Sequence, residues 1–157
     1  MHRFLLASLW VCFGVTMATA QTKTSGTEQC SKPDPQHVLP VGDRPDHQMN
    51  LQQMKCTWTK PMEIEGVKAK EGVGTETNDI NGGSLRTRGS HVATMESGDK
   101  FFASYQGTGS SAGVKGTWSF TGGSGKLKGI KGKGTYNCTP SGDGFSCEIE
   151  GEYQLAK

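Results

Sequence analysis

The sequence predicts an all-β fold, a small antiparallel eight-stranded barrel with an N-terminal arm. Short segments of alternating apolar and polar residues are separated by recurring Gly, Asn, Asp and Pro turn signals. No stretch shows a convincing helical period. Glycine accounts for 23 of the 157 residues, and a sheet this rich in glycine coils readily. That favours closure into a barrel over a flat sandwich.

The first twenty residues have the pattern of a secretory signal peptide. Arg3 supplies the positive charge, residues 4–15 form an apolar run, and Ala18 and Ala20 fit the small-residue cleavage rule. The apolar run is too short to span a bilayer. We therefore expect cleavage before Gln21 and a secreted or periplasmic protein with no membrane span.

Residues 21–50 are predicted to form a proline-rich arm ahead of a barrel domain at 51–157. Pro33, Pro35, Pro40 and Pro45 occur in this segment. Prolines at this density disfavour a regular helix or a central strand. We expect barrel strands at 53–60, 62–70, 72–80, 85–96, 100–107, 115–121, 127–138 and 145–155.

The last predicted strand has the clearest alternation and sets the register of a hairpin. In residues 145–155, apolar side chains and a glycine alternate with serine, glutamate and glutamine. If Cys138 lies opposite Cys147, then Tyr136 lies opposite Ile149, and both pairs face the core. A slip of one residue would place apolar side chains opposite charged ones. This agreement predicts both the hairpin and a Cys138–Cys147 disulfide.

The remaining cysteines predict a second disulfide. Removal of the signal peptide deletes Cys12 and leaves four cysteines, an even number suited to an oxidising compartment. Three pairings are open in principle. Once Cys138 and Cys147 are paired, Cys30–Cys56 follows by elimination.

The glycine-rich segment 116–136 carries a family resemblance. It contains a Gly122-Gly123-x-Gly125 turn, a large apolar residue two positions later at Leu127, and then Gly129 and Gly132. This arrangement resembles the strand-turn-strand signature of the allene oxide cyclase-like barrels, to which dirigent proteins are related. The segment is most similar to secreted bacterial members of unassigned function.

The resemblance implies an eight-stranded barrel whose lumen can hold an apolar molecule. The family includes cyclases and other enzymes that act on small hydrophobic molecules. No motif here places their polar site residues one by one, so the resemblance does not transfer an activity. Because related barrels often form dimers or trimers, it also implies a homo-oligomer as one arrangement.

Charge and spacing exclude several function classes. A formal net charge of +2 argues against nucleic acid or an anionic membrane as the main partner. The histidines lack metal-ligand spacing and the cysteines are committed to disulfides, so we predict no metal site and no cofactor. The Gly109–Gly113 segment matches the Gly-x-Ser-x-Gly motif of a nucleophile elbow. A strand and not a helix is predicted to follow it, so we interpret the segment as a hairpin loop.

Three functions remain. The first is binding of a small hydrophobic molecule in the lumen, lined by Trp118, Phe101 and Tyr105. The second is a cyclase or isomerase that uses His91 or Glu65 in the lumen. The third is a structural or interaction protein whose lumen those aromatic side chains fill. An open cavity of about 300 Å3 or more would favour the first two functions over the third.

Overall fold

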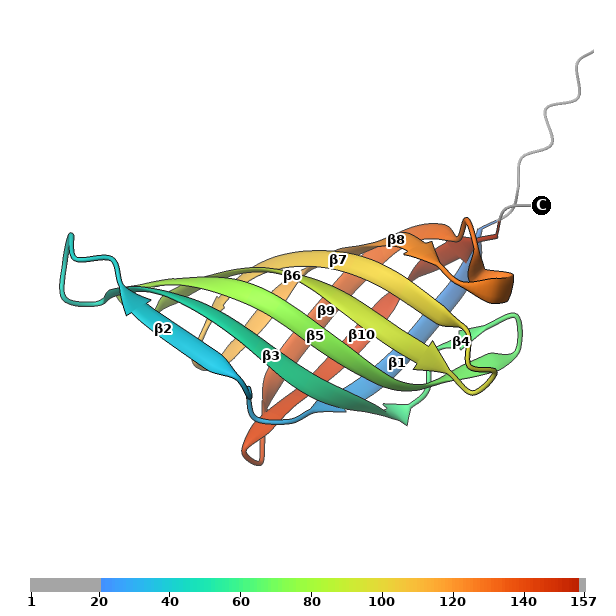
Figure 1. Cartoon of the computed structure of the whole chain (residues 1–157), viewed down its shortest axis with the longest axis horizontal. Coiled ribbons are helices and arrows are strands. Elements are labelled where there is room, and N and C mark those ends of the chain that lie inside the picture. The colour runs from blue at the N-terminus through green and yellow to red at the C-terminus, as the bar shows by residue number, and fades with distance from the viewer. Residues whose placement is uncertain (1–20, 156–157) are drawn as a thin grey trace, which may run out of the picture.

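The computed structural model describes residues 21–155 and shows an antiparallel β-barrel (Figure 1). The predicted signal peptide, residues 1–20, lies outside the described residues. Within them, no helix is long and apolar enough to cross a membrane. The elements are β1 (Thr22–Cys30), β2 (Gln36–Pro40), β3 (His47–Lys60), β4 (Glu63–Ile64), β5 (Val67–Asn81), β6 (Ser84–Met95), β7 (Lys100–Ser110), β8 (Gly113–Gly123), the 3-10 turn η1 (Gly125–Leu127), β9 (Lys131–Ser141) and β10 (Gly144–Gln154).

Eight of the strands form the closed wall. Their order around the barrel is β3-β1-β10-β9-β8-β7-β6-β5, and β5 pairs with β3 to complete the circuit. Strand β2 continues along the edge of β3 beyond β1, and β4 forms a two-residue hairpin with β5. The predicted eight-stranded antiparallel barrel is therefore confirmed, with two short strands added to it.

The hairpin of β9 and β10 has the register that the sequence predicts. Cys138 lies opposite Cys147 and Tyr136 lies opposite Ile149. The alternation works because the apolar positions face the interior and the glutamates of β10 face outward or toward the rim. Both predicted disulfides, Cys30–Cys56 and Cys138–Cys147, are present. Two disulfides are typical of an oxidising, extracellular type of environment.

The N-terminal segment differs from the prediction. Thr22–Cys30 is a wall strand, β1, and pairs with β10 along its whole length. The prolines that suggested an arm all follow Cys30: they lie between β1 and β2, at the end of β2, and in the loop before β3. The barrel wall therefore begins at Thr22 and not at residue 51.

Two predicted strand boundaries are also wrong. The predicted strands 62–70 and 72–80 are mainly one strand, Val67–Asn81, because the interruption near residue 71 is a bulge against β6 and not a turn. The predicted strand 127–138 begins only at Lys131. The 3-10 turn η1 precedes it and places Leu127 and Ile130 in the core.

Large interior side chains lie over glycines of nearby strands. A Cβ atom added at Gly89 would lie 2.5 Å from the Tyr105 ring, and one added at Gly151 would lie 2.5 Å from the Trp118 ring. These close approaches require glycine, since a methyl group there would displace the ring. The glycine-rich composition therefore makes room for aromatic side chains inside a narrow barrel.

Candidate functional site

The barrel interior contains a cavity of about 150 Å3. Much of its wall is apolar, with Met54, Trp58, Phe101, Trp118 and Phe120 among the lining residues. This lumen cavity is smaller than the 300 Å3 or so that a drug-sized ligand needs. By the criterion set above, its size alone does not favour ligand binding over a packed lumen. The cavity matches the size of apolar cavities that hold a single benzene ring.

One end of the interior is a packed apolar core. It lies toward the β4 hairpin and η1, which are at the same end of the barrel in Figure 1. Ile64 is completely buried there, and Met62, Met95 and Leu127 are nearly so. The edge-to-face contacts of Phe120 with Phe101 and Trp118 extend this core to the cavity.

The other end of the interior is polar. The inward-facing side chains here are Asn50 and Gln52 on β3, Glu76 and Asn78 on β5, and Thr87 on β6. All except Glu76 are buried. Their strands run on toward β2, at the opposite end of the barrel from η1 (Figure 1).

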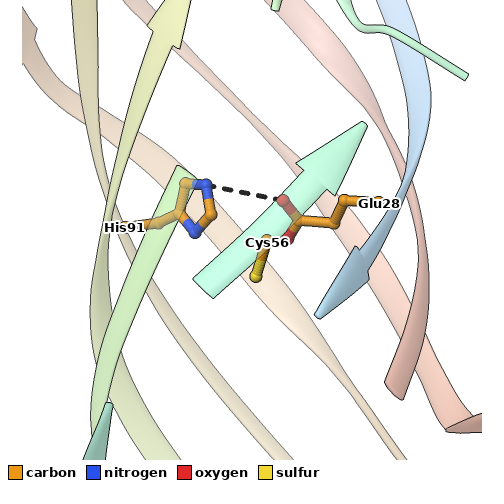
Figure 2. A group of neighbouring side chains, drawn as sticks. All are labelled: Glu28, Cys56 and His91. Atoms are coloured by element: carbon orange, nitrogen blue, oxygen red, sulfur yellow. Dashed lines mark ion pairs between the residues drawn. The ribbon is translucent and has the colours of Figure 1, made fainter. Parts of the chain in front are cut away.

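A carboxyl group and an imidazole group meet at the middle of the lumen. Glu28 comes from β1 and His91 from β6, and Glu28 Oε2 lies 3.5 Å from His91 Nε2 (Figure 2). This distance is too long for a hydrogen bond, and neither atom has a hydrogen-bond partner among residues 21–155. Glu28 is only 6% exposed.

Burial shifts the proton affinities of this pair in opposite directions. Loss of hydration disfavours the charged forms. It raises the pKa of Glu28 from 4.5 to about 7 and lowers the pKa of His91 from 6.5 to about 4. Near neutral pH the imidazole is therefore uncharged, and the contact with Glu28 is not a pair of full charges.

A second inward carboxyl group, that of Glu76, is held very differently. It accepts hydrogen bonds from Gln52 Nε2 at 2.7 Å, Asn78 Nδ2 at 3.0 Å and the Tyr105 hydroxyl at 2.9 Å. Burial, and then the charge of Glu76, raises the pKa of Tyr105 well above its usual range. Tyr105 therefore stays protonated and serves as a hydrogen-bond donor.

Several other buried polar atoms, on side chains that line the cavity, have no hydrogen-bond partner among the described residues. Such atoms are rare in proteins and are costly to leave unpaired. With the two atoms of the central pair, they form a discontinuous set of donors and acceptors around an otherwise apolar space. They are Asn78 Oδ1, Thr87 Oγ1, Tyr136 Oη and Trp58 Nε1.

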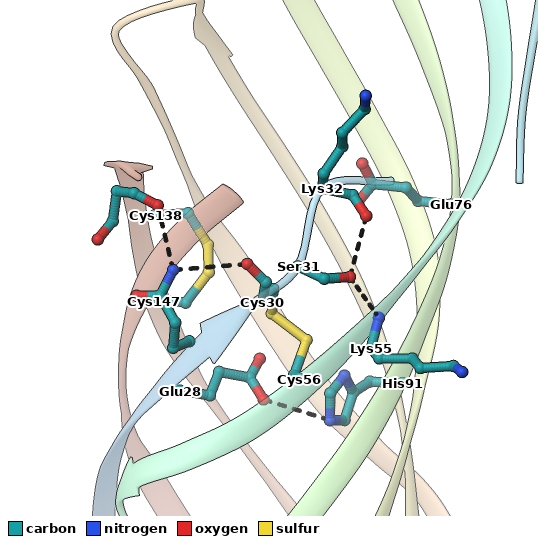
Figure 3. Close-up of a disulfide and its surroundings, with 12 residues drawn as sticks. Glu28, Cys30, Ser31, Lys32, Lys55, Cys56, Glu76, His91, Cys138 and Cys147 are labelled. Carbon is teal, nitrogen blue, oxygen red and sulfur yellow. Dashed lines mark hydrogen bonds and ion pairs between the residues drawn. A yellow bond between two sulfur atoms is a disulfide. The ribbon is translucent and has the colours of Figure 1, made fainter. Parts of the chain in front are cut away.

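Both disulfides border the central pair. Cys30 and Cys56 join β1 to β3 immediately beside Glu28, and Cys138 and Cys147 lie on the adjacent hairpin (Figure 3). All four cysteines line the cavity. The cross-links therefore hold in place the strands that carry Glu28.

The structure places some of the sequence-predicted site residues in the lumen cavity and others outside it. Phe101, Tyr105, Trp118 and His91 all line the lumen cavity. Glu65 does not: it lies in the turn between β4 and β5, where its carboxyl group accepts a hydrogen bond from the Tyr153 hydroxyl at 3.4 Å. Gly109–Gly113 is a hairpin connection between β7 and β8, not a strand-to-helix elbow.

The predicted hairpin register placed Tyr136 on the buried face, but no sequence pattern indicated that Glu28 and Glu76 are lumen residues. Glu28 lies in a hydrophilic segment, and its inward orientation follows only from the pairing of β1 with β10 and β3. The position of Cys30, two residues after Glu28 on the same strand, was the available signal. Residues two apart on a strand share a face, so a cysteine buried in a disulfide places Glu28 inside as well.

A wider depression of about 1630 Å3 is lined by residues of β1 and of β3 to β10. Exposed serine, threonine, lysine and glutamate side chains form much of its lining. No unpartnered buried side-chain atom of residues 21–155 belongs to a residue that lines it. The smaller lumen cavity is therefore the better candidate for a built site.

Comparisons with known proteins support the barrel fold. No protein-family model and no curated protein sequence matches it. The pterocarpan synthase dirigent protein GePTS1 is similar in structure, with a TM-score of 0.51 and 11% identity over 96% of this chain and 100% of that one. The related PsPTS1 has a TM-score of 0.51 and 11% identity over 88% and 97%.

A weaker structural similarity is to pyocyanin demethylase, with a TM-score of 0.48 and 15% identity over 81% of this chain and 98% of that one. At identities this low, the similarity to the dirigent proteins shows a shared barrel fold and nothing of the chemistry inside it.

Proposed function

We propose that this protein binds a small, mainly apolar molecule with one polar group in its lumen, and that it does so outside the cytoplasm. The observation that carries the proposal is the set of unpartnered buried polar atoms around an apolar cavity of about 150 Å3. Polar groups buried without partners destabilise a fold. A ligand that pairs with them would offset that cost.

The cavity limits the size of the ligand. A space of this volume suits a molecule of about one ring, as in apolar protein cavities that bind benzene. The rings of Phe101, Trp118 and Phe120 supply its apolar wall. Larger molecules would require the side chains of the polar end to move.

The polar atoms limit its chemistry. Hydroxyl groups of Thr87 and Tyr136 can each donate or accept, and the neutral His91 ring offers one nitrogen of each kind. A hydroxyl or carbonyl group on the ligand would suit this mixture. An anionic ligand would find no lysine or arginine among the described residues that line the cavity. A phenol or a cyclic ketone is therefore the expected chemical class.

Membership of the allene oxide cyclase-like barrel family is also part of the proposal. The Gly122–Gly132 signature and the dirigent-like barrel both support it. Secretion is supported by the N-terminal signal pattern and by the two disulfides.

The test compares one-ring ligands of similar size with and without a polar group. Native mass spectrometry of the protein purified from its source would identify a retained ligand, and thermal shifts with phenol, benzene and cyclohexanone would rank the probes. We expect phenol or cyclohexanone to bind more tightly than benzene, and Thr87→Val to reduce that preference with Ser90→Ala as the outward-facing control. No retained ligand and no shift with any probe would favour a structural protein with a packed lumen.

A second function, proton transfer, is favoured by the geometry of Glu28 and His91. Their free atoms lie side by side at the cavity, where a carboxyl group could take a proton from one carbon of a ligand and return it to another. Cyclohex-3-enone is a probe of suitable size. Glu28→Gln should abolish its conversion to the conjugated isomer without abolishing binding; equal conversion by both proteins would refute this function.

A further inference from the structure

The central pair belongs to a larger cluster of metal-ligating side chains. Ligand atoms of Glu28, Cys56 and His91 all lie within 4.8 Å of one another (Figure 2). A second group, which shares Glu28, brings in Cys30 and Cys147 at the same spacing. The three elements that carry Glu28, Cys56 and His91 are β1, β3 and β6, so no local sequence spacing reveals the cluster.

The sulfur atoms are not free in this structure. Cys30 and Cys56 are joined in a disulfide (Figure 3), and metal ions in proteins bind the thiolate. The sequence-based expectation of no metal site rests on this pairing. It applies to the oxidised protein only.

We propose that reduction of the Cys30–Cys56 disulfide creates a buried site for Zn2+. A dithiol or phosphine reductant supplies two electrons, the S–S bond breaks, and two protons from solvent give two thiols. Binding of Zn2+ then releases both thiol protons and forms bonds to two thiolates. Cys56, His91 and Glu28 are the three ligands that already lie within 4.8 Å of one another. Cys30 lies within that distance of Glu28 in the second group, and after reduction it has to turn toward the other three ligands to complete four.

The donor set is the one that zinc prefers. Structural zinc sites are almost always tetrahedral and combine cysteine, histidine and carboxylate ligands. Soft thiolates beside an imidazole favour zinc over magnesium or calcium, which take oxygen ligands. Both non-sulfur ligands are already inside the barrel with their ligating atoms unpartnered, so binding would not require breaking a hydrogen bond at these atoms.

The site would make the lumen responsive to redox state. In the oxidised protein, Glu28 and His91 face the cavity and are free to contact an organic ligand. In the reduced, zinc-bound protein, the same two side chains are occupied by the ion. This inference does not depend on the proposed small-molecule function, because it uses only the fold and the cluster.

Cobalt(II) is the probe, since a tetrahedral cobalt–thiolate site has strong visible d–d bands and a thiolate charge-transfer band. The purified protein is titrated with Co2+ and then with Zn2+, before and after anaerobic reduction with a phosphine. Circular dichroism checks that the reduced barrel remains folded. We expect one tetrahedral cobalt per reduced chain, displaced by one zinc, and none in the oxidised protein.

Four variants locate the site. The double variant Cys30→Ser/Cys56→Ser should lose the signal, whereas Cys138→Ser/Cys147→Ser should keep it. Glu28→Gln and His91→Gln, which preserve side-chain size, should each weaken cobalt binding by at least about tenfold. Unchanged binding in both would place the metal elsewhere. Unfolding on reduction, or no cobalt in the reduced protein, would also overturn the proposal.

Discussion

Two carboxyl groups inside the barrel, Glu76 in the polar end and Glu28 in the middle, differ in their surroundings. Glu76 accepts three hydrogen bonds from side chains of β3, β5 and β7. Glu28 Oε2 accepts none from the part of the chain that the structure describes, and Nε2 of the His91 ring is 3.5 Å away. An inward-facing carboxyl group whose hydrogen bonds are satisfied contributes to the stability of the barrel, and an unsatisfied one is available to a ligand, proton or metal.

The largest effect is expected from exchanging each carboxyl group for an amide. Glu76→Gln places an NH2 group among three donors, and we expect it to lower the free energy of unfolding by about 2–3 kcal/mol. Glu28→Gln removes a charge that has no donor, and at pH 8 it should raise that free energy by about 1–2 kcal/mol. Urea denaturation of the oxidised proteins measures both. Equal losses in the two variants would remove the distinction between the two carboxyl groups.

The pH dependence of stability should separate Glu28 from His91. Because the pKa of folded Glu28 is raised from 4.5 to about 7, its contribution to stability is lost as pH rises through that interval. Because the pKa of His91 is lowered from 6.5 to about 4, its contribution is lost as pH falls from 6.5 to 4. In the wild type the two slopes oppose each other between about pH 4.5 and 6.5.

Single variants should separate the contributions of Glu28 and His91 to the pH dependence of stability. Relative to the wild type, Glu28→Gln should become more stable as pH rises above 4.5, by up to about 1.4 kcal/mol per pH unit. His91→Asn should show the opposite trend between pH 4 and 6.5. Subtracting the wild-type curve from each denaturation series cancels the other titrating groups. Parallel curves for all three proteins would show that neither group has a shifted pKa.

The hairpin that positions this site was predictable, whereas the strand that carries Glu28 was not. The register of β9 and β10 followed from apolar side chains alternating with glutamates, and from Cys138 and Cys147. Strand β1 has no such alternation: its inward positions are Thr24, Gly26, Glu28 and Cys30. Hydrophobic periodicity cannot reveal a strand whose buried face is polar.

The candidate site was accordingly predicted only in part. The sequence allowed four lining residues to be named, because they lie on strands whose pattern is visible in the sequence: His91, Phe101, Tyr105 and Trp118. Their polar partners depend on contacts between distant strands, such as the approach of β1 to β6 across the lumen. Burial is a tertiary property, so the shifted pKa values of the central pair could not be read from the sequence.

Two tyrosines test whether the network around Glu76 is structural. The Tyr105 hydroxyl donates to Glu76 at 2.9 Å, whereas the Tyr136 hydroxyl is buried without a partner among the described residues. Tyr105→Phe should therefore cost about 1–2 kcal/mol of unfolding free energy, and Tyr136→Phe less than about 0.5 kcal/mol. The same denaturation assay measures both. A larger loss for Tyr136→Phe would mean that its hydroxyl has an internal partner, such as a buried water.

A small effect of opposite sign is expected at Thr87, which is 4% exposed and whose hydroxyl has no partner among residues 21–155. Thr87→Val replaces that hydroxyl with a methyl group of similar size and keeps the β-branched shape suited to a strand. Because the replaced hydroxyl has no partner, we expect the change to raise the free energy of unfolding of the ligand-free protein by up to about 1 kcal/mol. The gain should disappear when phenol is present, because the wild type alone can hydrogen-bond the ligand there. Thermal unfolding with and without phenol measures both quantities, and Ser90→Ala on the outer face serves as the control. A loss of stability in the ligand-free protein would show that the Thr87 hydroxyl, like the Glu76 carboxyl group, stabilises the barrel.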